Sequence, residues 1–388
     1  MNTVYVLGVG RHREFALRTL ENSGFRVRVV DLPSNVPVSY MQDAFFGDPK
    51  ESGTLDAVLA DANENDVLIT WDELVVEATQ VAARRVRTPR LMSPALVRNK
   101  YAMRRALASA GLRVPSHVYV ANQADLNHLR LPDFPVVVKP VDYGGSGGVT
   151  VVSEERDLVP AFAWAQSKTG HGVMIEEFVE GPEFSLEAVV CENRSAFLGI
   201  TQKFVTPLPL RFEAAHIFPA LDAPIELRRQ AEEMIRSVAD AVGIRAAAMH
   251  LEVLWAGGEP YIVEVAARLG GDYIPELVYL SSGVNPYLLE VQAVEGSMHE
   301  TRVPVLRHAG VRFYYPDRRG KVEWPNRWAP TGNVRVVHQG RWVPAGVEVP
   351  GTITSIGSRL GCEILTGTGE ELAHALGERD GGPRIQSA

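Results

Sequence analysis

The first 92 residues alternate short apolar runs with amphipathic segments. The run TVYVL is followed by the helix-like segment REFALRTLENSG and by a second apolar run, FRVRVVD, which ends at Asp31. DVLIT at 66–70 is a further apolar run, and DELVVEATQVAARR behind it has the pattern of a helix. Because strands that alternate with helices are typical of βαβ units, residues 1–92 are predicted to form a small doubly wound α/β domain.

The centre of the chain mixes helix and strand patterns. Residues 93–120 predict a helix that Ser93 caps and that ends at Gly111, before Pro115. Residues 225–243 predict an amphipathic helix with one apolar stripe. The stripe consists of Leu227, Ala231, Met234, Ile235, Val238 and Val242. The segments AMHLEVLW and YIVEVAA that follow are predicted to be two strands joined by AGGEP.

The last part of the chain has a different pattern. From about residue 305 short β-branched runs alternate with prolines, as in VRFYYP and GVEVPG. A final amphipathic segment, GEELAHALGE, predicts a helix, and the polar tail RDGGPRIQSA behind it is predicted to be disordered. The chain is therefore expected to end in a small strand-rich part.

Composition narrows the functional classes. The 388 residues suggest two or three domains, and the net charge of −8 argues against binding to a nucleic-acid backbone. No apolar run reaches the roughly 18–20 residues that a membrane span needs. Cys191 and Cys362 lie far apart, and the start MNTVYVLGVG resembles a strand more than a signal peptide. We expect a cytoplasmic protein that contacts neither membrane nor nucleic acid.

Gly8 and Gly10 follow the first predicted strand and invite a dinucleotide interpretation. The third glycine of that fingerprint would stand at position 13, where the chain has Arg13. A tight turn after the strand explains the two glycines without a ligand. We therefore do not predict a nicotinamide cofactor.

A lysine and a glycine loop form the first candidate site. In FPVVVKPVDYGGSGGVTVV, Lys139 ends one β-branched run, and residues 144–148 contain four glycines before the next run begins. Backbone N–H groups of such a loop favour anions, so the pair suits phosphate groups. The loop is not a Walker A motif, because no Gly-Lys-Ser/Thr follows it, and a kinase loop fits poorly, because the lysine precedes the glycines.

Two glutamates form the second candidate site. If the predicted hairpin is centred on Gly258, Glu252 and Glu264 lie opposite each other, with Cβ atoms about 5 Å apart. Like charges in this position are destabilising, so a cation between them is expected, and Mg²⁺ binds through one or two carboxylates plus phosphate oxygens. The alternative is an exposed hairpin face with solvated glutamates. Arg268 follows closely, and its permanently charged fork suits phosphate or carboxylate.

Together these segments resemble the ATP-grasp superfamily of ADP-forming carboxylate–amine ligases, over about residues 1–300. The resemblance implies an α/β ATP-grasp fold with α+β elements, ATP as cosubstrate, and Mg²⁺, or Mn²⁺ in its place, on Glu252 and Glu264. It implies that Glu176 and the backbone of Glu177 and Val179 meet adenine and that Glu183 binds ribose. The residues that it assigns to ATP are Lys100, Lys139, Gly145, Ser146, Gly147, Glu176, Glu177, Val179 and Glu183.

The resemblance also implies a division of the chain. The expected parts are an N-terminal Rossmann-like domain (1–92), a linker helix region (93–125), a lid subdomain (126–192), a catalytic subdomain (193–300) and a strand-rich C-terminal subdomain with a disordered tail (301–388).

One position departs from the family pattern. Many members read Glu-x-Asn-x-Arg at the second metal strand, and here the asparagine position is Ala266. Some bacterial L-amino-acid ligases resemble this chain in having Ala-Ala-Arg there. The departure puts the coordination of a second Mg²⁺ in doubt and favours the dipeptide-forming branch over D-alanine–D-alanine ligase.

The resemblance implies that a carboxylate is activated as an acyl phosphate and then joined to an amine, with Arg268 as the catalytic residue. Each substrate candidate also has a simpler interpretation, as an exposed lysine, a solvated glutamate, a buried histidine or a helix cap; His250 is expected to be structural. The substrate candidates are Lys203, Glu213, His216, Gly270, Gly271 and Asp272.

Two other functions stay open. A carboxylase-like enzyme that activates bicarbonate is suggested by the C-terminal segments, and a nucleotide-binding regulator without catalysis is suggested by Ala266. The expected partners are small-molecule carboxylates and amines, and the resemblance also allows a homodimer.

Overall fold

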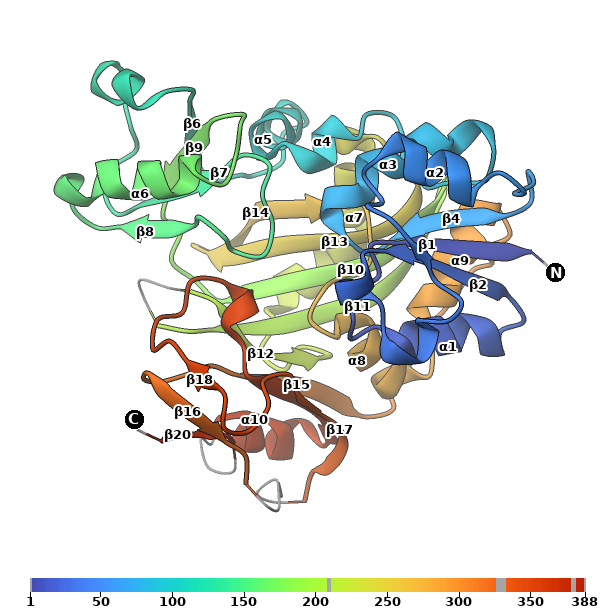
Figure 1. Ribbon diagram of the computed structural model, residues 1–388. Helices are drawn as coiled ribbons and strands as arrows, with labels where there is room; N and C mark the ends of the chain where they lie inside the picture. The colour runs from blue at the N-terminus through green and yellow to red at the C-terminus, as the bar shows by residue number, and fades with distance from the viewer. Residues whose placement is uncertain (1, 208–210, 326–332, 378–381, 387–388) are drawn as a thin grey trace.

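The computed structural model describes residues 2–207, 211–325, 333–377 and 382–386. The N-terminal part is a four-stranded sheet in the order β3-β2-β1-β4, and all of its pairings are parallel (Figure 1). Its strands are β1 (Thr3–Leu7), β2 (Arg26–Asp31), β3 (Phe45–Phe46) and β4 (Val67–Thr70). Its helices are α1 (Glu14–Asn22), α2 (Ser52–Val58) and α3 (Val76–Val81). The predicted α/β pattern of this region is confirmed.

The region after this sheet differs from the prediction of one helix that begins at Ser93 and ends at Gly111. The structure has α4 (Ala95–Arg98) and α5 (Lys100–Ser109), separated at Asn99. Asn99 has extended backbone angles, and its side chain accepts hydrogen bonds from the N–H groups of Tyr101 and Ala102. It is therefore an N-cap that starts a new helix and places Lys100 in its first turn.

A second, antiparallel sheet forms the upper left of Figure 1, in the order β6-β9-β7-β8. Its strands are β6 (His117–Val120), β7 (Val136–Pro140), β8 (Thr150–Val152) and β9 (Val173–Glu177), and α6 (Leu158–Gln166) packs on it. Its buried residues, Val138 and Phe162 among them, form a hydrophobic cluster of their own. We call this unit, with its glycine loop between β7 and β8, the lid sheet.

The largest sheet has nine strands, in the order β14-β13-β10-β11-β12-β15-β19-β17, with β5 paired to β13. Its strands are β5 (Arg90–Leu91), β10 (Glu183–Cys191), β11 (Arg194–Val205), β12 (Glu213–Phe218), β13 (Ile244–Ala256), β14 (Glu259–Ala266), β15 (His308–Tyr314), β17 (Arg335–Arg341) and β19 (Gly361–Gly367). The helices α7 (Ile225–Val242), α8 (Ile274–Ser282) and α9 (Pro286–Glu295) contact it. The predicted stripe of α7 is buried, which confirms that helix.

The C-terminal part adds a three-stranded sheet, β18-β16-β20, and the helix α10 (Gly369–Gly377). The strands are β16 (Gly320–Glu323), β18 (Glu348–Val349) and β20 (Arg384–Gln386). The prediction of a disordered tail is wrong for residues 384–386, because these residues pair with β16 in an antiparallel ladder. Of that predicted tail, residues 379–381 and 387–388 lie outside the described residues.

Short 3₁₀ helices complete the fold: Pro33–Asn35, Val38–Tyr40, Glu73–Val75, Ala82–Arg84, Gln123–His128, Glu155–Asp157 and Ile356–Ser358. The largest hydrophobic cluster joins the N-terminal sheet, through Val4 and Val6, to Tyr287 and Val291 of α9. The N-terminal sheet is therefore packed on the large sheet through α9. No helix in the described ranges has the length and apolar content that a membrane crossing requires.

Candidate active site

The two predicted metal-ligating glutamates are paired across β13 and β14, as predicted. The hairpin differs in detail, because its turn is Gly257–Gly258 and a bulge interrupts the ladder between Glu252 and Val253. On the turn side of the bulge Val253 pairs with Ile262, and on the other side Glu252 pairs with Glu264, so Val263 is the extra residue of the bulge. The bulge compensates for the shifted turn and leaves Glu252 opposite Glu264.

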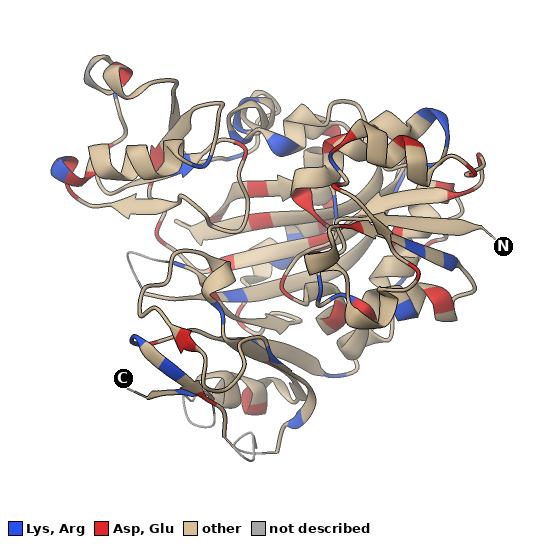
Figure 2. Ribbon diagram, in the orientation of Figure 1, with Lys and Arg blue, Asp and Glu red and all other residues tan. Residues whose placement is uncertain are grey.

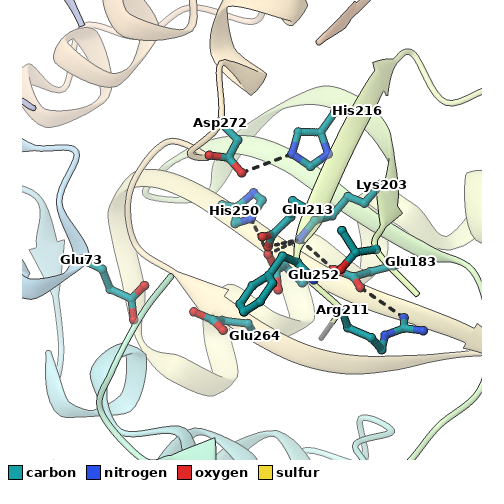
Figure 3. Close-up of polar contacts among 12 residues, drawn as sticks. Glu73, Glu183, Lys203, Arg211, Glu213, His216, His250, Glu252, Glu264 and Asp272 are labelled. Atoms are coloured by element: carbon teal, nitrogen blue, oxygen red, sulfur yellow. Dashed lines mark hydrogen bonds and ion pairs between the residues drawn. The ribbon is translucent and has the colours of Figure 1, made fainter. Parts of the chain in front are cut away.

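Lys203 is the centre of a buried acidic cluster (Figure 3). Its Nζ lies 2.6 Å from Glu252, 2.8 Å from Glu183 and 3.6 Å from Glu213. Although burial alone would lower the pKa of Lys203, these carboxylates raise it well above its ordinary value. The interpretation of Lys203 as an exposed surface lysine is wrong.

His250, which was expected to be structural, also lines the cavity and contacts Glu252. Its Nδ1 lies 2.8 Å from Glu187, and its Nε2 lies 3.1 Å from Glu252. Burial alone would lower the pKa of this imidazole, but the two carboxylates raise it to about 10. Burial opposes ionisation of Glu252, but Lys203 and His250 hold its pKa well below its ordinary value.

Arg268 reaches the N-terminal sheet. Its Nη2 donates to Glu73 at 3.1 Å, and its Nη1 donates to the carbonyl of Leu269 at 2.8 Å. Glu73 also accepts from Arg98 at 3.1 Å. Burial opposes ionisation of Glu73, but Lys100, Arg268 and Arg98 lower its pKa, so this carboxylate is charged. Glu73 thereby orients the predicted catalytic arginine.

Lys100 connects the lid sheet to the acidic pair. Its Nζ donates to the carbonyl of Tyr143 at 3.0 Å and lies 3.6 Å from Glu264. Burial raises the pKa of Glu264, and the nearby carboxylates of Glu73 and Glu252 raise it further against the effect of Lys100. The site therefore has an excess of negative charge at Glu264, where a cation would be stabilised.

Of the other predicted ATP residues, Lys139, Glu176 and Glu177 lie on the lid sheet, and Glu183 begins β10 of the large sheet. Lys139 forms a buried ion pair with Glu176, which also accepts from Arg104 at 3.2 Å. Burial lowers the pKa of Lys139, and Glu176 opposes that shift. Glu177 accepts from the N–H of Ser116 at 3.0 Å. The contacts of these residues with adenine stay predictions, as does ribose binding by Glu183, whose carboxylate is paired with Lys203.

The glycine loop has the unusual backbone that its sequence suggests. Gly145, Ser146 and Gly148 have φ values of 64°, 56° and 79°, in the left-handed region. Gly147 packs against the ring of Tyr143. A Cβ added to Gly145 would lie only 3.1 Å from Cδ1 of Ile356, so the loop touches the C-terminal part of the chain.

Asp272 follows the glycine pair with a φ of 54°. Arg359 binds its two carboxylate oxygens at 2.6 and 2.7 Å, and Nε2 of His216 lies 3.5 Å away. Glu213 lies 3.8 Å from Arg359, and burial raises its pKa to about 7. Gly270, by contrast, packs against His250 and Glu187 behind this loop.

These groups surround a cavity of about 150 Å³. Most of the predicted catalytic, metal and substrate residues line it, together with two of the predicted ATP residues, Gly145 and Ser146. The catalytic, metal and substrate residues are Lys203, Glu213, His216, Glu252, Glu264, Arg268, Gly271 and Asp272. Four lining residues were not predicted as site residues: Glu73, His250, Ile274 and Ile356. Figure 2 shows acidic segments side by side on β13 and β14 at this place.

The residues present fit one divalent cation. Glu252 and Glu264 face each other, and the raised pKa of Glu264 reflects charge that a cation would neutralise. Among the described residues no group of three or more His, Cys, Asp or Glu side chains forms a complete metal site. Two carboxylates suffice for Mg²⁺ only when phosphate oxygens complete its coordination, so the site suits a metal that arrives with a nucleotide.

For one of the site residues that were not predicted, Glu73, the sequence does contain a signal. Glu73 stands just behind the buried strand at 66–70, and ligands in parallel α/β sheets bind outside the carboxyl ends of strands. The sequence contains no such signal for Arg359 and Ile356, because no periodicity connects the C-terminal segment to a site more than 80 residues away.

Comparison with known proteins agrees with this geometry. Residues 132–276 match the family model described as an ATP-grasp domain. Dapdiamide A synthase from Enterobacter agglomerans is 24% identical over 204 residues, covering 50% of this chain and 45% of that protein. A D-alanine–D-alanine ligase from Desulforudis audaxviator is 29% identical over 212 residues, covering 48% of this chain and 68% of that protein. The matched parts span about half the length of the first curated relatives.

Solved structures share the fold over nearly the whole chain. An L-amino acid ligase from Bacillus licheniformis superposes with a TM-score of 0.80 at 22% identity, covering 100% of this chain and 99% of that one. N5-carboxyaminoimidazole synthetase from Staphylococcus aureus, complexed with ADP, gives 0.74 at 16% identity and covers 97% of each chain. The predicted ATP-grasp fold class is confirmed, and residues 132–276 are the part of the chain that matches the ATP-grasp domain family.

Proposed function

We propose that this protein is an ATP-dependent, ADP-forming ligase that joins the carboxylate of an amino acid to an amine. The observation that carries the proposal is the opposed pair Glu252 and Glu264, with Arg268 at the same cavity and Lys100 3.6 Å from Glu264. Carboxylates for a metal and fixed cations for phosphate are what phosphoryl transfer needs, because that reaction depends mainly on positioning and charge neutralisation.

The parts of the site have separate roles in the proposal. Glu252 and Glu264 would hold Mg²⁺, which neutralises charge on the phosphates of ATP when it is bound. Lys139 and the loop residues Gly145 and Ser146 would contact the phosphates. Lys203 and His250 keep Glu252 ionised and in place.

The reaction would proceed in two steps. A carboxylate oxygen of the first substrate attacks the γ-phosphorus of ATP, the bond to the bridging oxygen breaks, and ADP leaves. The amine nitrogen of the second substrate then attacks the acyl carbon, and inorganic phosphate leaves as the amide forms. Arg268 stabilises the oxyanion of this second step. Glu213, with a pKa of about 7, is suited to take the proton that the amine loses.

The similar proteins support this reaction class. Two of them are named as ligases of amino acids, D-alanine–D-alanine ligase and L-amino acid ligase, and a third is named dapdiamide A synthase. The chain has Ala266 at the position where many superfamily members have asparagine, which favours the L-amino-acid branch. A dipeptide or a related amide is the proposed product.

A bicarbonate-activating enzyme is the second candidate, because a biotin carboxylase domain complexed with MgADP and bicarbonate superposes with a TM-score of 0.72. Phosphate release is to be measured with ATP and Mg²⁺ against amino acids singly and in pairs, with bicarbonate as a separate arm. Release that needs two organic substrates, with a product lighter than their sum by one water, is the expected result. Release with bicarbonate alone would overturn the amide-ligase proposal.

A further inference from the structure

The 352–358 segment of the C-terminal part reaches the active site from outside the ATP-grasp domain. It contains the 3₁₀ turn Ile356–Ser358, and in Figure 1 the red chain before β19 lies beside the loop that joins β7 to β8. Ile356 contacts Gly145 of that loop and lines the cavity that also contains Glu264 and Arg268.

Hydrogen bonds within the segment and the contacts of Arg359 hold it beside the cavity. The N–H of Gly357 donates to Ser355 Oγ at 3.1 Å, and the N–H of Thr354 donates to Ser358 Oγ at 3.2 Å. Directly behind it, Arg359 is buried, binds Asp272 with two hydrogen bonds and lies 3.7 Å over the ring of Phe313. The turn is therefore fixed to the loop that follows the metal strands.

Ile356 gives this wall an apolar surface in a cavity that is otherwise lined mostly by charged and polar side chains. Ile274 and Ile356 are the aliphatic side chains beyond glycine among the described residues that line the cavity, and Ile274 is buried at the start of α8. Ile356 is only half-buried. Its Cδ1 and Cγ1 fill the space that a side chain on Gly145 would need. The exposed part of Ile356 is therefore the surface that a substrate side chain would meet.

The volume of the cavity limits the size of the side chain that could bind against Ile356. A volume of about 150 Å³ is small beside the roughly 300–1,000 Å³ of ordinary ligand pockets. We propose that Ile356 braces the closed glycine loop and sets an upper limit on the side chain of the amino-acid substrate, so that small amino acids are preferred. The proposal of a substrate limit rests on the proposed ligase function, whereas the bracing of the loop does not.

The chain offers a matched control. Ile353 lies in the same segment, but it lines a different cavity, beside Tyr314 and Tyr315. Ile356→Ala and Ile353→Ala remove the same atoms from the same segment, and only the first changes the active-site wall. Differences between the two variants therefore report on the site and not on the folding of the segment.

The first experiment compares kcat/KM for alanine, valine, leucine and phenylalanine as substrates in the wild type and both variants. Ile356→Ala is expected to raise the leucine-to-alanine ratio about tenfold or more, since a few methylenes in an apolar pocket are worth that much. Ile353→Ala is expected to leave the ratio unchanged. An unchanged ratio in an active Ile356→Ala variant would overturn the size limit.

The second experiment measures hydrogen exchange of residues 143–148 with Mg²⁺ and a non-hydrolysable ATP analogue bound. Exchange in this loop is expected to accelerate in Ile356→Ala and to stay at the wild-type rate in Ile353→Ala. Equal exchange in both variants would overturn the bracing. A wild type that is inactive with every amino acid would refute the proposed function and, with it, the size limit. In that case the exchange rates of the loop would still test whether Ile356 braces it.

Discussion

Arg268 donates a hydrogen bond of 3.1 Å to Glu73, a residue 195 positions earlier in the chain. The pair joins the N-terminal sheet to the end of the metal strands, and Arg98 completes it from α4. An arginine that is to stabilise charge in a reaction must not move freely. Glu73 supplies that restraint from an element that contains no other residue of the cavity lining.

Replacing Glu73 by glutamine should therefore affect both stability and activity. Removing one charge from a buried pair costs about 3 kcal/mol or more, because Arg98 and Arg268 lose their carboxylate partner and stay buried. We expect kcat/KM to fall about 100-fold, because a small misplacement of a catalytic group has such an effect. Urea unfolding and steady-state kinetics test both, with the exposed Glu77→Gln on α3 as control. Activity at the wild-type level would show that Arg268 needs no partner.

Glu264→Gln should nearly abolish ADP release and leave the fold intact. The pKa of Glu264 is raised by burial and by its acidic neighbours, so loss of its charge relieves repulsion, and the melting temperature should not fall. Loss of one electrostatic partner of the transition state lowers kcat by about 10²–10³-fold. Glu259→Gln, at the exposed end of the same strand, is the control. Full activity in Glu264→Gln would exclude Glu264 as a metal ligand.

Gly145→Ala should lower activity for two separable reasons. The added methyl group would lie 3.1 Å from Ile356, and alanine disfavours a φ of 64° by about 1 kcal/mol. Adding Ile356→Ala should remove the first penalty and not the second. We therefore expect the double variant to recover part of the kcat lost in Gly145→Ala. A double variant that is worse than the product of the two single effects would contradict the contact.

Glu290 predicts a pH dependence of stability. Its carboxyl is buried in α9, where it accepts from the indole N–H of Trp71, and burial raises its pKa from 4.5 to about 8. Between these values the folded protein keeps a proton that the unfolded chain has lost. Stability should therefore fall as the pH rises through this window, by up to about 1.4 kcal/mol per pH unit.

Chemical unfolding at pH 5, 6, 7 and 8 measures that slope. Glu290→Gln keeps an acceptor for Trp71 and has no proton to lose, so its free energy of unfolding should vary less with pH than that of the wild type. Glu295→Gln, at the end of the same helix, should keep the wild-type slope. Equal slopes in all three proteins would mean that Glu290 titrates normally in the folded state.

Local patterns predicted the parts of the fold that local forces determine. The apolar stripe of α7 and the alternation around Glu252 follow from the geometry of a helix and a strand, and both were correct. The break at Asn99 was missed because a capping side chain inside a helical pattern gives only a weak signal.

The charges of the site could not be assigned in the same way. Lys203 and His250 were open to simpler interpretations, because nothing near them in the sequence shows which carboxylates will surround them. The same holds for Arg359, whose partner Asp272 lies 87 residues away. Burial and distant charges decide these pKa values, and both are properties of the folded chain.

The bulge at Val263 determines which side of the sheet is acidic. A regular ladder continued from the Gly257–Gly258 turn would set Val263 opposite Glu252 and would turn Glu264 into the apolar layer with Ile262. One extra residue in a strand turns every side chain beyond it to the opposite face of the sheet. The carbonyl of Val263 accepts from Arg104 at 2.6 Å, so the skipped residue is itself bound. The acidic pair therefore depends on a count of residues as much as on their kind, and a deletion of Val263 would preserve it.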